Sequence, residues 1–257
     1  MSMTIALIQA RLRSTRLPGK VLMSLEGMPL LELMLKRLAR SKKLDSIAIV
    51  TSLEPENEAI AYVCKQLDIP CYKGSEADVL DRYYQAAIHY GAEHIVRLTA
   101  DCPLIDSDIV DGVIGKYYSS NADIAFTKNF PDGQCVGVFS FRALKAAWES
   151  AKLPSEREHV VPWIRKQSTE EGQNTFKCVY YACEDDLYSE RWTIDEADDY
   201  IFFRELVKAL PMPIIDASWK DILNTIRLHP EISRINKHIC PDEGYQKSLE
   251  EDKKICL

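Results

Sequence analysis

The first half of the chain alternates short apolar runs with amphipathic segments, and this rhythm restricts the fold more than any other feature. Strands are expected at residues 3–9, 47–50, 69–72 and 94–98, with helices between them at 28–41, 55–68, 76–90 and 106–118. In the first helix one face is apolar and carries Leu31, Met34, Leu35 and Leu38. Strands that alternate with helices in this way predict an α/β fold with a mainly parallel sheet.

The rhythm changes after residue 120. Strands are expected at 122–127 and 135–140, helices at 141–151 and 156–167, extended segments at 175–181 and 191–194, a helix at 196–210, and short helices to the end. No internal repeat or linker-like segment divides the chain. Because 257 residues suffice for one large buried core, we expect a single domain over 1–257, with 211–257 as a C-terminal helical extension.

Charge and hydropathy exclude several classes of protein. The formal net charge is -7, whereas a protein with a general nucleic-acid footprint is usually basic, so no nucleic-acid partner is expected. No stretch approaches the roughly 20 apolar residues that span a bilayer, so no membrane partner is expected either. The apolar run at residues 4–8 is too short for a signal sequence, which favours a cytoplasmic location. The cysteines lack the spacing of a zinc site.

A basic loop, "ARLRSTRLPGK" at residues 10–20, follows the first expected strand. It contains four cations, Arg11, Arg13, Arg16 and Lys20. Ligands of open α/β sheets bind beyond the carboxyl ends of the strands, where backbone N–H groups and cations form anion sites. A Walker loop is excluded, since it requires glycine in place of Ser14 and Ser or Thr in place of Val21. The loop predicts an anion site; the alternative is a solvated loop that binds nothing.

Two aspartates end extended runs farther along the chain. Asp101 follows the expected strand 94–98, and its carboxylate can hold Mg²⁺ on a nucleotide's phosphates. It can equally open a turn ahead of Pro103. Asp195 ends the run "WTID", and its alternative role is to cap the helix 196–210. If both carboxylates lie on one sheet edge, Asp195 becomes a second metal ligand.

Two further segments favour helix capping over chemistry. The run "SEREH" predicts a capping box with Ser155 as N-cap and Glu158 at the third helical position, although Arg157 and His159 could still face a substrate carboxylate. The triplet at 106–108 resembles the D-x-D of metal-dependent glycosyltransferases. We expect it instead to cap a helix that begins near Ile109.

Five segments in a fixed order resemble a known family. "QARLRSTRLPGKVL", "GSEADVLDRYYQAA", "RLTADCPLID", "SEREHVVPWI" and "RWTIDEADD" are similar to motifs of the cytidylyltransferase family of spore-coat polysaccharide biosynthesis protein F. That family is related to CMP-KDO and CMP-sialic acid synthetases. The resemblance covers roughly residues 3–210, with a weaker echo at Asn236 and in "EGYQKSLEED".

The resemblance implies a fold and a reaction. The expected fold is a three-layer, nucleotide-diphospho-sugar transferase-like α/β fold, with a mainly parallel mixed sheet flanked by helices. The expected reaction transfers CMP from CTP to a sugar acid or sugar phosphate, releases pyrophosphate and uses Mg²⁺, in surface polysaccharide biosynthesis. Related synthetases are commonly dimers, so a homodimer is expected.

The resemblance also assigns residues. It implies a triphosphate-binding and catalytic set around the basic loop, with Ala10, Arg11, Ser14, Arg16 and Lys20, and it implies Asp101 and Asp195 as metal ligands, Asp101 also being catalytic. It implies further nucleotide contacts at Ser52, Gly74, Ser75, Asp78, Arg82 and Ala100. The acceptor is expected near Asn129, Arg157 and His159.

One stretch departs from the family. Many relatives read "PDG-L-DVEVFSF", whereas this chain reads "PDGQCVGVFSF", so Cys135 and Gly137 stand where Asp and Glu are common. The loss of two acids on the sugar side is consistent with a different, more anionic acceptor, or with loss of activity. Two alternatives therefore stay open: a metal-dependent glycosyltransferase that uses a nucleotide sugar, and a nucleotide-binding pseudoenzyme.

Overall fold

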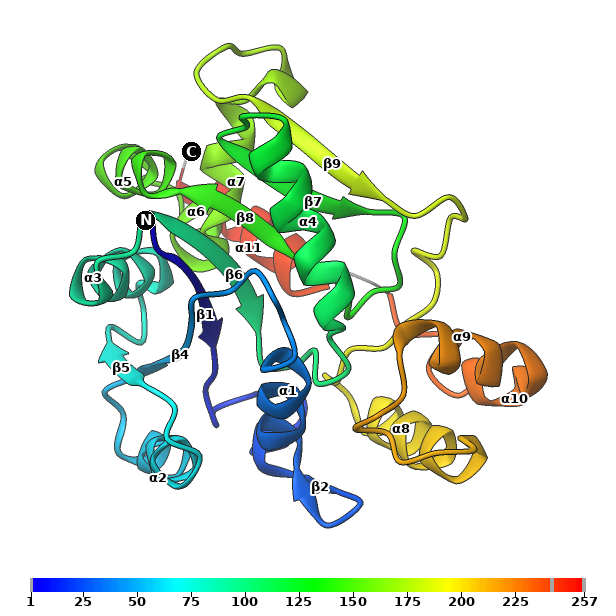
Figure 1. Cartoon of the computed structure of the whole chain (residues 1–257). Coiled ribbons are helices and arrows are strands. Elements are labelled where there is room, and N and C mark those ends of the chain that lie inside the picture. The colour runs from blue at the N-terminus through cyan, green and yellow to red at the C-terminus, as the bar shows by residue number, and fades with distance from the viewer. Residues whose placement is uncertain (1, 241–242, 256–257) are drawn as a thin grey trace.

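A seven-stranded mixed sheet forms the centre of the molecule (Figure 1). The computed structural model describes residues 2–240 and 243–255. The strand order is β5-β4-β1-β6-β8-β7-β9. The strands are β1 (Thr4–Gln9), β4 (Ser46–Ser52), β5 (Cys71–Gly74), β6 (His94–Thr99), β7 (Ile124–Lys128), β8 (Gly137–Ser140) and β9 (Cys178–Ala182). The half from β5 to β6 is parallel, and β8 runs antiparallel to both of its neighbours.

Helices cover both faces of the sheet, which gives the expected three layers and confirms the predicted fold class (Figure 1). One face is covered by α1 (Leu30–Leu38), α2 (Glu58–Gln66) and α4 (Ser107–Ser119), and the other by α3 (Val79–Tyr90), α5 (Phe141–Ser150) and α7 (Val161–Lys166). Side chains of a strand alternate between faces, so Ile8 packs under α1 whereas its neighbour Leu7 packs under α3.

A third apolar cluster lies beside the sheet. It joins α8 (Ala197–Ala209), α9 (Trp219–Leu228) and α10 (Pro230–Ser233) to α1 and to the hairpin of β2 (Ser24–Leu25) and β3 (Met28–Pro29). The buried Arg37 guanidinium fastens this cluster to the sheet, since it donates to the carbonyls of Leu104, Ile105, Ile214 and Ala217. The division into one domain and an extension at 211–257 stays a prediction.

The last helix, α11 (Glu243–Ile255), returns to α6 (Pro154–His159). The Asp252 carboxylate accepts hydrogen bonds from the backbone N–H (3.0 Å) and the hydroxyl (2.5 Å) of Ser155. Ser248 bonds to Glu158 at 3.1 Å and lies 3.0 Å from the His159 ring. The C-terminal helix α11 thus packs against and stabilises α6, the segment in which the sequence places residues expected to contact the substrate.

Two expectations about local structure are wrong. Ser155 forms no capping box: α6 begins at Pro154, and the Glu156 carboxylate accepts from the N–H groups of Lys152 and Leu153, each at 3.2 Å. The helix expected at 156–167 divides at Val160, whose φ is 67°. Residues 191–194, expected to be extended, belong to no named strand, and Arg191 forms an isolated bridge with Asp132. Three short 3₁₀ turns complete the elements: Lys20–Leu22, Pro55–Asn57 and Thr169–Glu171.

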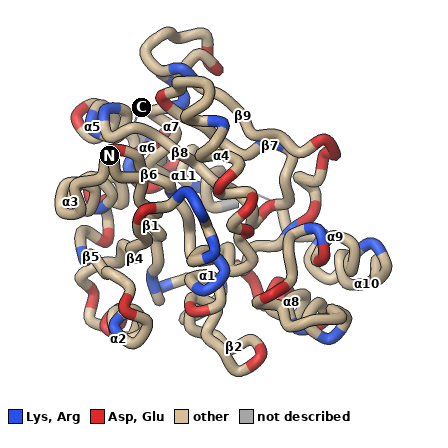
Figure 2. Tube along the Cα trace, viewed as in Figure 1, with Lys and Arg blue, Asp and Glu red and all other residues tan. Residues whose placement is uncertain are grey.

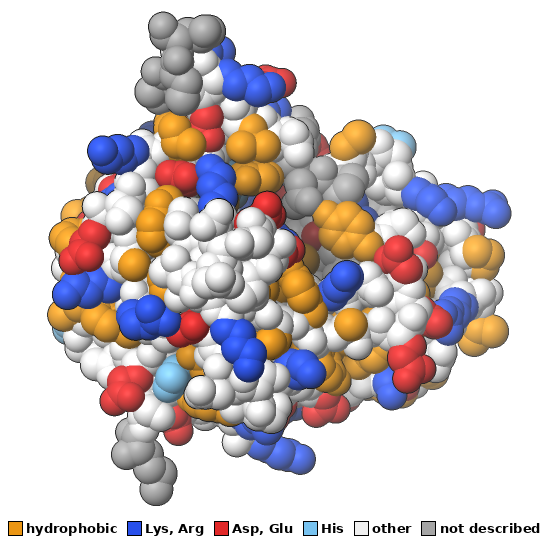
Figure 3. All heavy atoms as spheres, turned by 90° about the horizontal axis from the view of Figure 1, so that it is seen from above, with side chains coloured by type: hydrophobic (Ala, Val, Ile, Leu, Met, Phe, Trp, Pro, Cys, Tyr) orange, Lys and Arg blue, Asp and Glu red, His pale blue; other side chains and the backbone are white. Residues whose placement is uncertain are grey.

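Charged side chains are distributed unevenly. Figure 2 shows Lys and Arg following one another at the end of α1 and in the turn before β4. There the Asp111 carboxylate accepts from the N–H groups of Lys42 (2.9 Å) and Lys43 (3.2 Å), and Arg40 pairs with Asp216, so this run is partly neutralised. The face in Figure 3 intersperses cationic and anionic side chains. No helix within the described ranges is long and apolar enough to cross a bilayer.

Candidate active site

Cations and carboxylates meet beyond the carboxyl ends of β1 and β6. The Lys20 ammonium contacts the Asp195 carboxylate and lies 3.7 Å from Oδ2 of Asp101. The Arg16 guanidinium lies 3.2 Å from the other oxygen of Asp195. We call Arg16, Lys20, Asp101 and Asp195 the cation–carboxylate cluster. The structure therefore brings together four residues that the sequence assigns to one site, although they come from three distant segments.

Backbone hydrogen bonds explain how the two aspartates become neighbours. Ala100 continues the β1–β6 ladder by donating its N–H to the Gln9 carbonyl at 2.9 Å, so Asp101 leaves the sheet one residue later. The Asp101 carbonyl then accepts from the N–H of Ile194 at 2.8 Å and from the Thr193 hydroxyl at 3.0 Å. This docking holds the segment before Asp195 against the turn that carries Asp101.

Asp195 is not the cap of α8. The Asp199 carboxylate performs that task, because it accepts from the N–H groups of Asp195 (2.8 Å) and Glu196 (2.9 Å). The Asp195 carboxylate is left to face Lys20, Arg16 and, at 3.6 Å, the Arg191 guanidinium. The capping alternative for Asp195 is therefore wrong.

A buried network lies directly behind Asp195. Arg191 and Asp199 form two hydrogen bonds, at 2.8 and 2.9 Å, and the Asn236 amide donates to Asp199 at 2.9 Å and to the Arg191 carbonyl at 3.0 Å. We call Arg191, Asp199 and Asn236 the buried network. Sequence reasoning assigned no role to Arg191 or Asp199, although both belong to the "RWTIDEADD" segment and Asn236 is the C-terminal echo of the same family.

The electrostatics keep Asp101 ionised. Burial alone would raise the pKa of its carboxyl group, but the Lys20 charge, the Thr99 and Cys102 side chains and the Arg97 charge outweigh burial, and the pKa is lowered. Burial and the Asp101 charge raise the pKa of the neighbouring Cys102 thiol well above its ordinary value. Cys102 therefore stays protonated and is a poor nucleophile, since the thiolate is the reactive form.

The two carboxylates are suitable ligands for Mg²⁺. Within residues 2–240 and 243–255 no group of three or more His, Cys, Asp or Glu side chains could hold a metal by itself. Mg²⁺, however, is commonly held by one or two carboxylates and by substrate phosphates, and it prefers oxygen ligands. Asp101 and Asp195 supply such oxygens, and the Lys20 ammonium already occupies a position beside both.

The expected nucleotide residues form a connected set around the basic loop. The Asn57 amide donates to the Ser52 hydroxyl at 2.6 Å, and its oxygen accepts from the N–H of Leu12 at 2.8 Å. Arg11 pairs with Glu76 at 3.3 Å and Glu158 at 3.7 Å. Asn57, which sequence reasoning missed, thus ties the end of β4 to the loop.

Arg82 is the most deeply buried cation of this set. Its side chain packs against Gly74, where an added Cβ would lie 3.0 Å from the Arg82 Cγ. Its Nη1 donates to the Ser75 carbonyl at 2.7 Å, while Nε and Nη2 have no hydrogen-bond partner among the residues described. Burial lowers the pKa of Arg82.

The residues expected near the acceptor are held by the protein itself. Arg157 donates from Nε to both oxygens of Asp78, at 3.0 and 3.1 Å, while Asp78 caps α3. The His159 ring lies edge-on to Tyr245, with centroids 5.1 Å apart. Asn129 follows β7 in a left-handed conformation, with φ of 63°, and its carbonyl accepts from the N–H of Leu187. The structure joins Arg157 to the nucleotide set rather than to Asn129.

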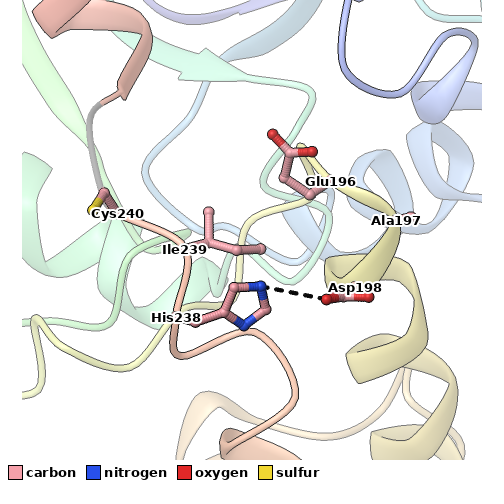
Figure 4. A pocket seen from close by; sticks show the side chains of 6 residues that line it. All are labelled: Glu196, Ala197, Asp198, His238, Ile239 and Cys240. Atoms are coloured by element: carbon pink, nitrogen blue, oxygen red, sulfur yellow. Dashed lines mark ion pairs between the residues drawn. The ribbon is translucent and has the colours of Figure 1, made fainter.

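A hollow of about 510 Å³ adjoins the cluster at the first turn of α8 (Figure 4). Its lining residues are Glu196, Ala197, Asp198, His238, Ile239 and Cys240. Glu196 also pairs with Arg16 at 3.4 Å, and the His238 ring lies 3.4 Å from the Asp198 carboxylate. No pattern in the sequence pointed to His238.

An α/β sheet with a basic loop after its first strand and carboxylates at the same edge defines the class: the protein is a nucleotidyltransferase. Residues 5–235 match the family model described as cytidylyltransferase. The chain belongs to the cytidylyltransferase family, which confirms the resemblance found in its motifs.

Individual relatives agree with this assignment. The chain is 38% identical over 237 residues to an uncharacterized protein of Methanocaldococcus jannaschii, covering 91% of this chain and 95% of that protein. It is 29% identical over 237 residues to the spore coat polysaccharide biosynthesis protein SpsF of Bacillus subtilis, covering 88% and 94%. A cytidylyltransferase structure from Leptospira borgpetersenii superposes with a TM-score of 0.83 at 32% identity, covering 90% of this chain and 97% of that one.

A more distant structure shares the fold alone. The CTP complex of CMP:2-keto-3-deoxy-manno-octonic acid synthetase superposes with a TM-score of 0.61 at 13% identity, covering 80% of this chain and 99% of that one.

Proposed function

We propose that this enzyme transfers CMP from CTP to a sugar acid or a sugar phosphate and releases pyrophosphate. The observation that carries the proposal is the cation–carboxylate cluster, because it combines groups for a triphosphate with groups for its metal at one sheet edge. The family and the CTP-bound fold relative support cytidine as the base.

The reaction is an in-line displacement at the α-phosphorus. An acceptor oxygen bonds to that phosphorus while its bond to the bridging oxygen breaks, and pyrophosphate leaves with the electron pair. A hydroxyl acceptor gives its proton to water. Such chemistry depends on positioning and on charge stabilisation rather than on covalent help from the protein.

The residues of the cluster divide this work. Arg16 and Lys20, together with Arg11 of the same loop, bind the β- and γ-phosphate oxygens, and arginine suits this role because its fork is bidentate. Asp101 and Asp195 hold Mg²⁺, which when bound neutralises phosphate charge and lowers the pKa of the attacking group. Lys20 exchanges its carboxylate partners for phosphate when the nucleotide enters.

The wider context also belongs to the proposal. A role in surface polysaccharide biosynthesis is supported by the name of the Bacillus subtilis relative. A cytoplasmic location and a homodimer remain predictions.

A pyrophosphate-release assay tests the function. Each of the four NTPs is supplied with Mg²⁺ and with a panel of octulosonic acids, nonulosonic acids and sugar phosphates. We expect release only with CTP and with one class of acceptor. Release of a free nucleoside mono- or diphosphate from a nucleotide sugar would indicate a glycosyltransferase. Tight CTP binding without turnover on any acceptor would indicate a pseudoenzyme.

A further inference from the structure

Arg97 on β6 is a cation that the proposed mechanism leaves unused. Its Nε is buried and has no hydrogen-bond partner, and no side-chain hydrogen bond or ion pair joins Arg97 to any residue that the structure describes. A buried donor without a partner destabilises the fold, so such a group calls for an explanation. One explanation is a ligand that supplies the missing hydrogen-bond acceptor.

The strand pairing of Arg97 shows which face of the sheet its side chain lies on. It pairs with Leu7 of β1 and with Gly137 of β8, and Leu7 lies on the face covered by α3. Its charge acts on both Tyr83 and Asp101: burial raises the pKa of Tyr83 to about 12 against the effect of Arg97, and Arg97 helps to lower the pKa of Asp101. The guanidinium is thus near the cation–carboxylate cluster, on the α3 side.

Other buried polar atoms lie on that side without partners. Gln9 is two residues beyond Leu7 on β1, so it shares the face of Arg97, and its side-chain oxygen has no partner. The fully buried Arg82 on α3 also has an unpartnered Nε and Nη2, although it packs against Gly74 on the nucleotide side of the sheet. Several unsatisfied donors and one acceptor on one face are typical of a site for a ligand with many oxygen atoms.

The strand order separates this ligand from the triphosphate. The basic loop follows β1, and the expected nucleotide residues Ser52 and Gly74 end β4 and β5, on the half of the sheet away from β8. Arg97 instead lies between β1 and β8, next to the strand where the sequence departs from its family. We therefore expect the ligand of Arg97 to be the acceptor sugar rather than the nucleotide.

The residue at position 137 determines whether the Arg97 guanidinium can bind a ligand. Residues paired across two antiparallel strands lie side by side on one face, so an acidic side chain at position 137 would neutralise the guanidinium. Glycine supplies no such group, and the nearest atom to an added Cβ is Cε1 of Phe126, at 3.1 Å. The charge of Arg97 is therefore left for a ligand.

We propose that Arg97 binds an anionic group of the acceptor, a carboxylate or a phosphate, and that Gly137 keeps its guanidinium unpaired for this purpose. The inference rests on the proposed cytidylyl transfer and assigns a residue to the anionic group that sugar acids and sugar phosphates share.

A matched pair of substitutions tests the role of charge. Gly137→Glu places a carboxylate beside Arg97, whereas Gly137→Gln adds a side chain of the same size without charge, so both displace the Phe126 ring equally. We expect the acceptor KM of Gly137→Glu to exceed that of Gly137→Gln by about 10- to 100-fold, the range of a hydrogen bond to a charged group, with equal KM for CTP. Equal acceptor KM values in the two variants would overturn the proposal.

Substitution of Arg97 itself tests the contact. Arg97→Met should raise the acceptor KM by about 10- to 100-fold, and Arg97→Lys should recover part of the loss. Arg142→Met, which removes an exposed cation paired with Asp123 at the far end of β8, is the control. Octulosonic and nonulosonic acids compared with hexose 1-phosphates identify the anion. A rise in the KM for CTP rather than for the acceptor would contradict the assignment.

Calorimetry separates this inference from the proposed function. If the wild type releases no pyrophosphate with any pair, the function has failed. Titration of the same acids and sugar phosphates into wild type and Arg97→Met, with melting curves to verify folding, still tests the anion site. Binding that is lost in Arg97→Met supports it. Equal binding in both proteins, or no binding to wild type, refutes it.

Discussion

Two sets of opposite charges meet at the first turn of α8, and they differ in how completely each is satisfied. In the cation–carboxylate cluster the side chains of Asp101 and Asp195 are 30% and 18% exposed, and Lys20 is shared between them. In the buried network the Asp199 side chain is fully buried and accepts from Arg191, from Asn236 and from two backbone N–H groups.

This difference indicates that the cation–carboxylate cluster takes part in the reaction, whereas the buried network stabilises the fold. Ion pairs that are partly exposed and shared can be exchanged for a phosphate or a metal, because water and ligand can reach them. A saturated buried carboxylate has no such exchange available, and losing one partner leaves the other charge unpaired. We therefore expect changes in the cluster to abolish activity while the fold persists, and changes in the network to weaken the fold.

The largest expected effect is on catalysis. Asp101→Asn removes a charge that the reaction requires and should lower kcat by about 10³-fold, the upper range for loss of one electrostatic group. The melting temperature should change little. Asp108→Asn, the same substitution at an exposed position in the first turn of α4, is the control for kcat. Near-normal pyrophosphate release by Asp101→Asn would remove the basis for the metal assignment.

Asp199→Asn tests the other side of the comparison. It removes the charge that forms two hydrogen bonds with the buried Arg191 and leaves this cation only its longer contacts with Asp132 (3.3 Å) and Asp195 (3.6 Å), so we expect a loss of about 3–5 kcal/mol in the free energy of unfolding, measured by urea denaturation. Asp198→Asn, one residue away on the same turn, should cost less than about 1 kcal/mol, as expected for an exposed pair. Similar losses in both variants would contradict the distinction.

The contribution of the buried network to stability should depend on pH. Burial would raise the pKa of Asp199, but Arg191 and the backbone N–H groups of Asp195 and Glu196 outweigh it, and the pKa is lowered. A carboxyl group whose pKa is lower in the folded protein stabilises the fold above its unfolded pKa, about 3.9, and this stabilisation is lost as pH falls further. The stability of wild type should thus decline more steeply below pH 4 than that of Asp199→Asn. Parallel curves would count against an ionised Asp199.

The smallest effect is expected where charges pair in water. Arg40 and Asp216 lie 2.6 Å apart, yet both side chains are about half exposed. Arg40→Gln should therefore change the free energy of unfolding by no more than about 1 kcal/mol. Arg37→Met, three residues earlier, should cost several times more, because it leaves four buried carbonyls without their donor. Thermal denaturation of the two variants would measure the contrast.

Much of this arrangement could be predicted from the sequence. Apolar runs and amphipathic periods located the strands and helices of the α/β half, and strand ends located the basic loop and Asp101 at one edge. Asp195 follows no strand, and the family resemblance assigned it to the same site. These inferences work because they depend on local patterns and on the rule that parallel strands present their carboxyl ends together.

The misses have a common physical cause, which is contact with distant segments. Ser155 bonds to Asp252 of α11, nearly a hundred residues away, so the local capping pattern was overridden. The break at Val160 had one local signal, because Pro162 favours the first turn of a new helix. The roles of Arg97 and Asp199 depend on sheet register and on burial, which no local pattern encodes.

The most direct test of the central claim follows the phosphorus of CTP. Wild type is incubated with Mg²⁺, an acceptor and CTP that is labelled at the α- or at the γ-phosphate. We predict that the α-label enters the sugar product and the γ-label enters pyrophosphate, and that Asp101→Asn slows both by about 10³-fold while it still folds. Recovery of the α-label only as unreacted CTP or as free CMP would contradict cytidylyl transfer at this site.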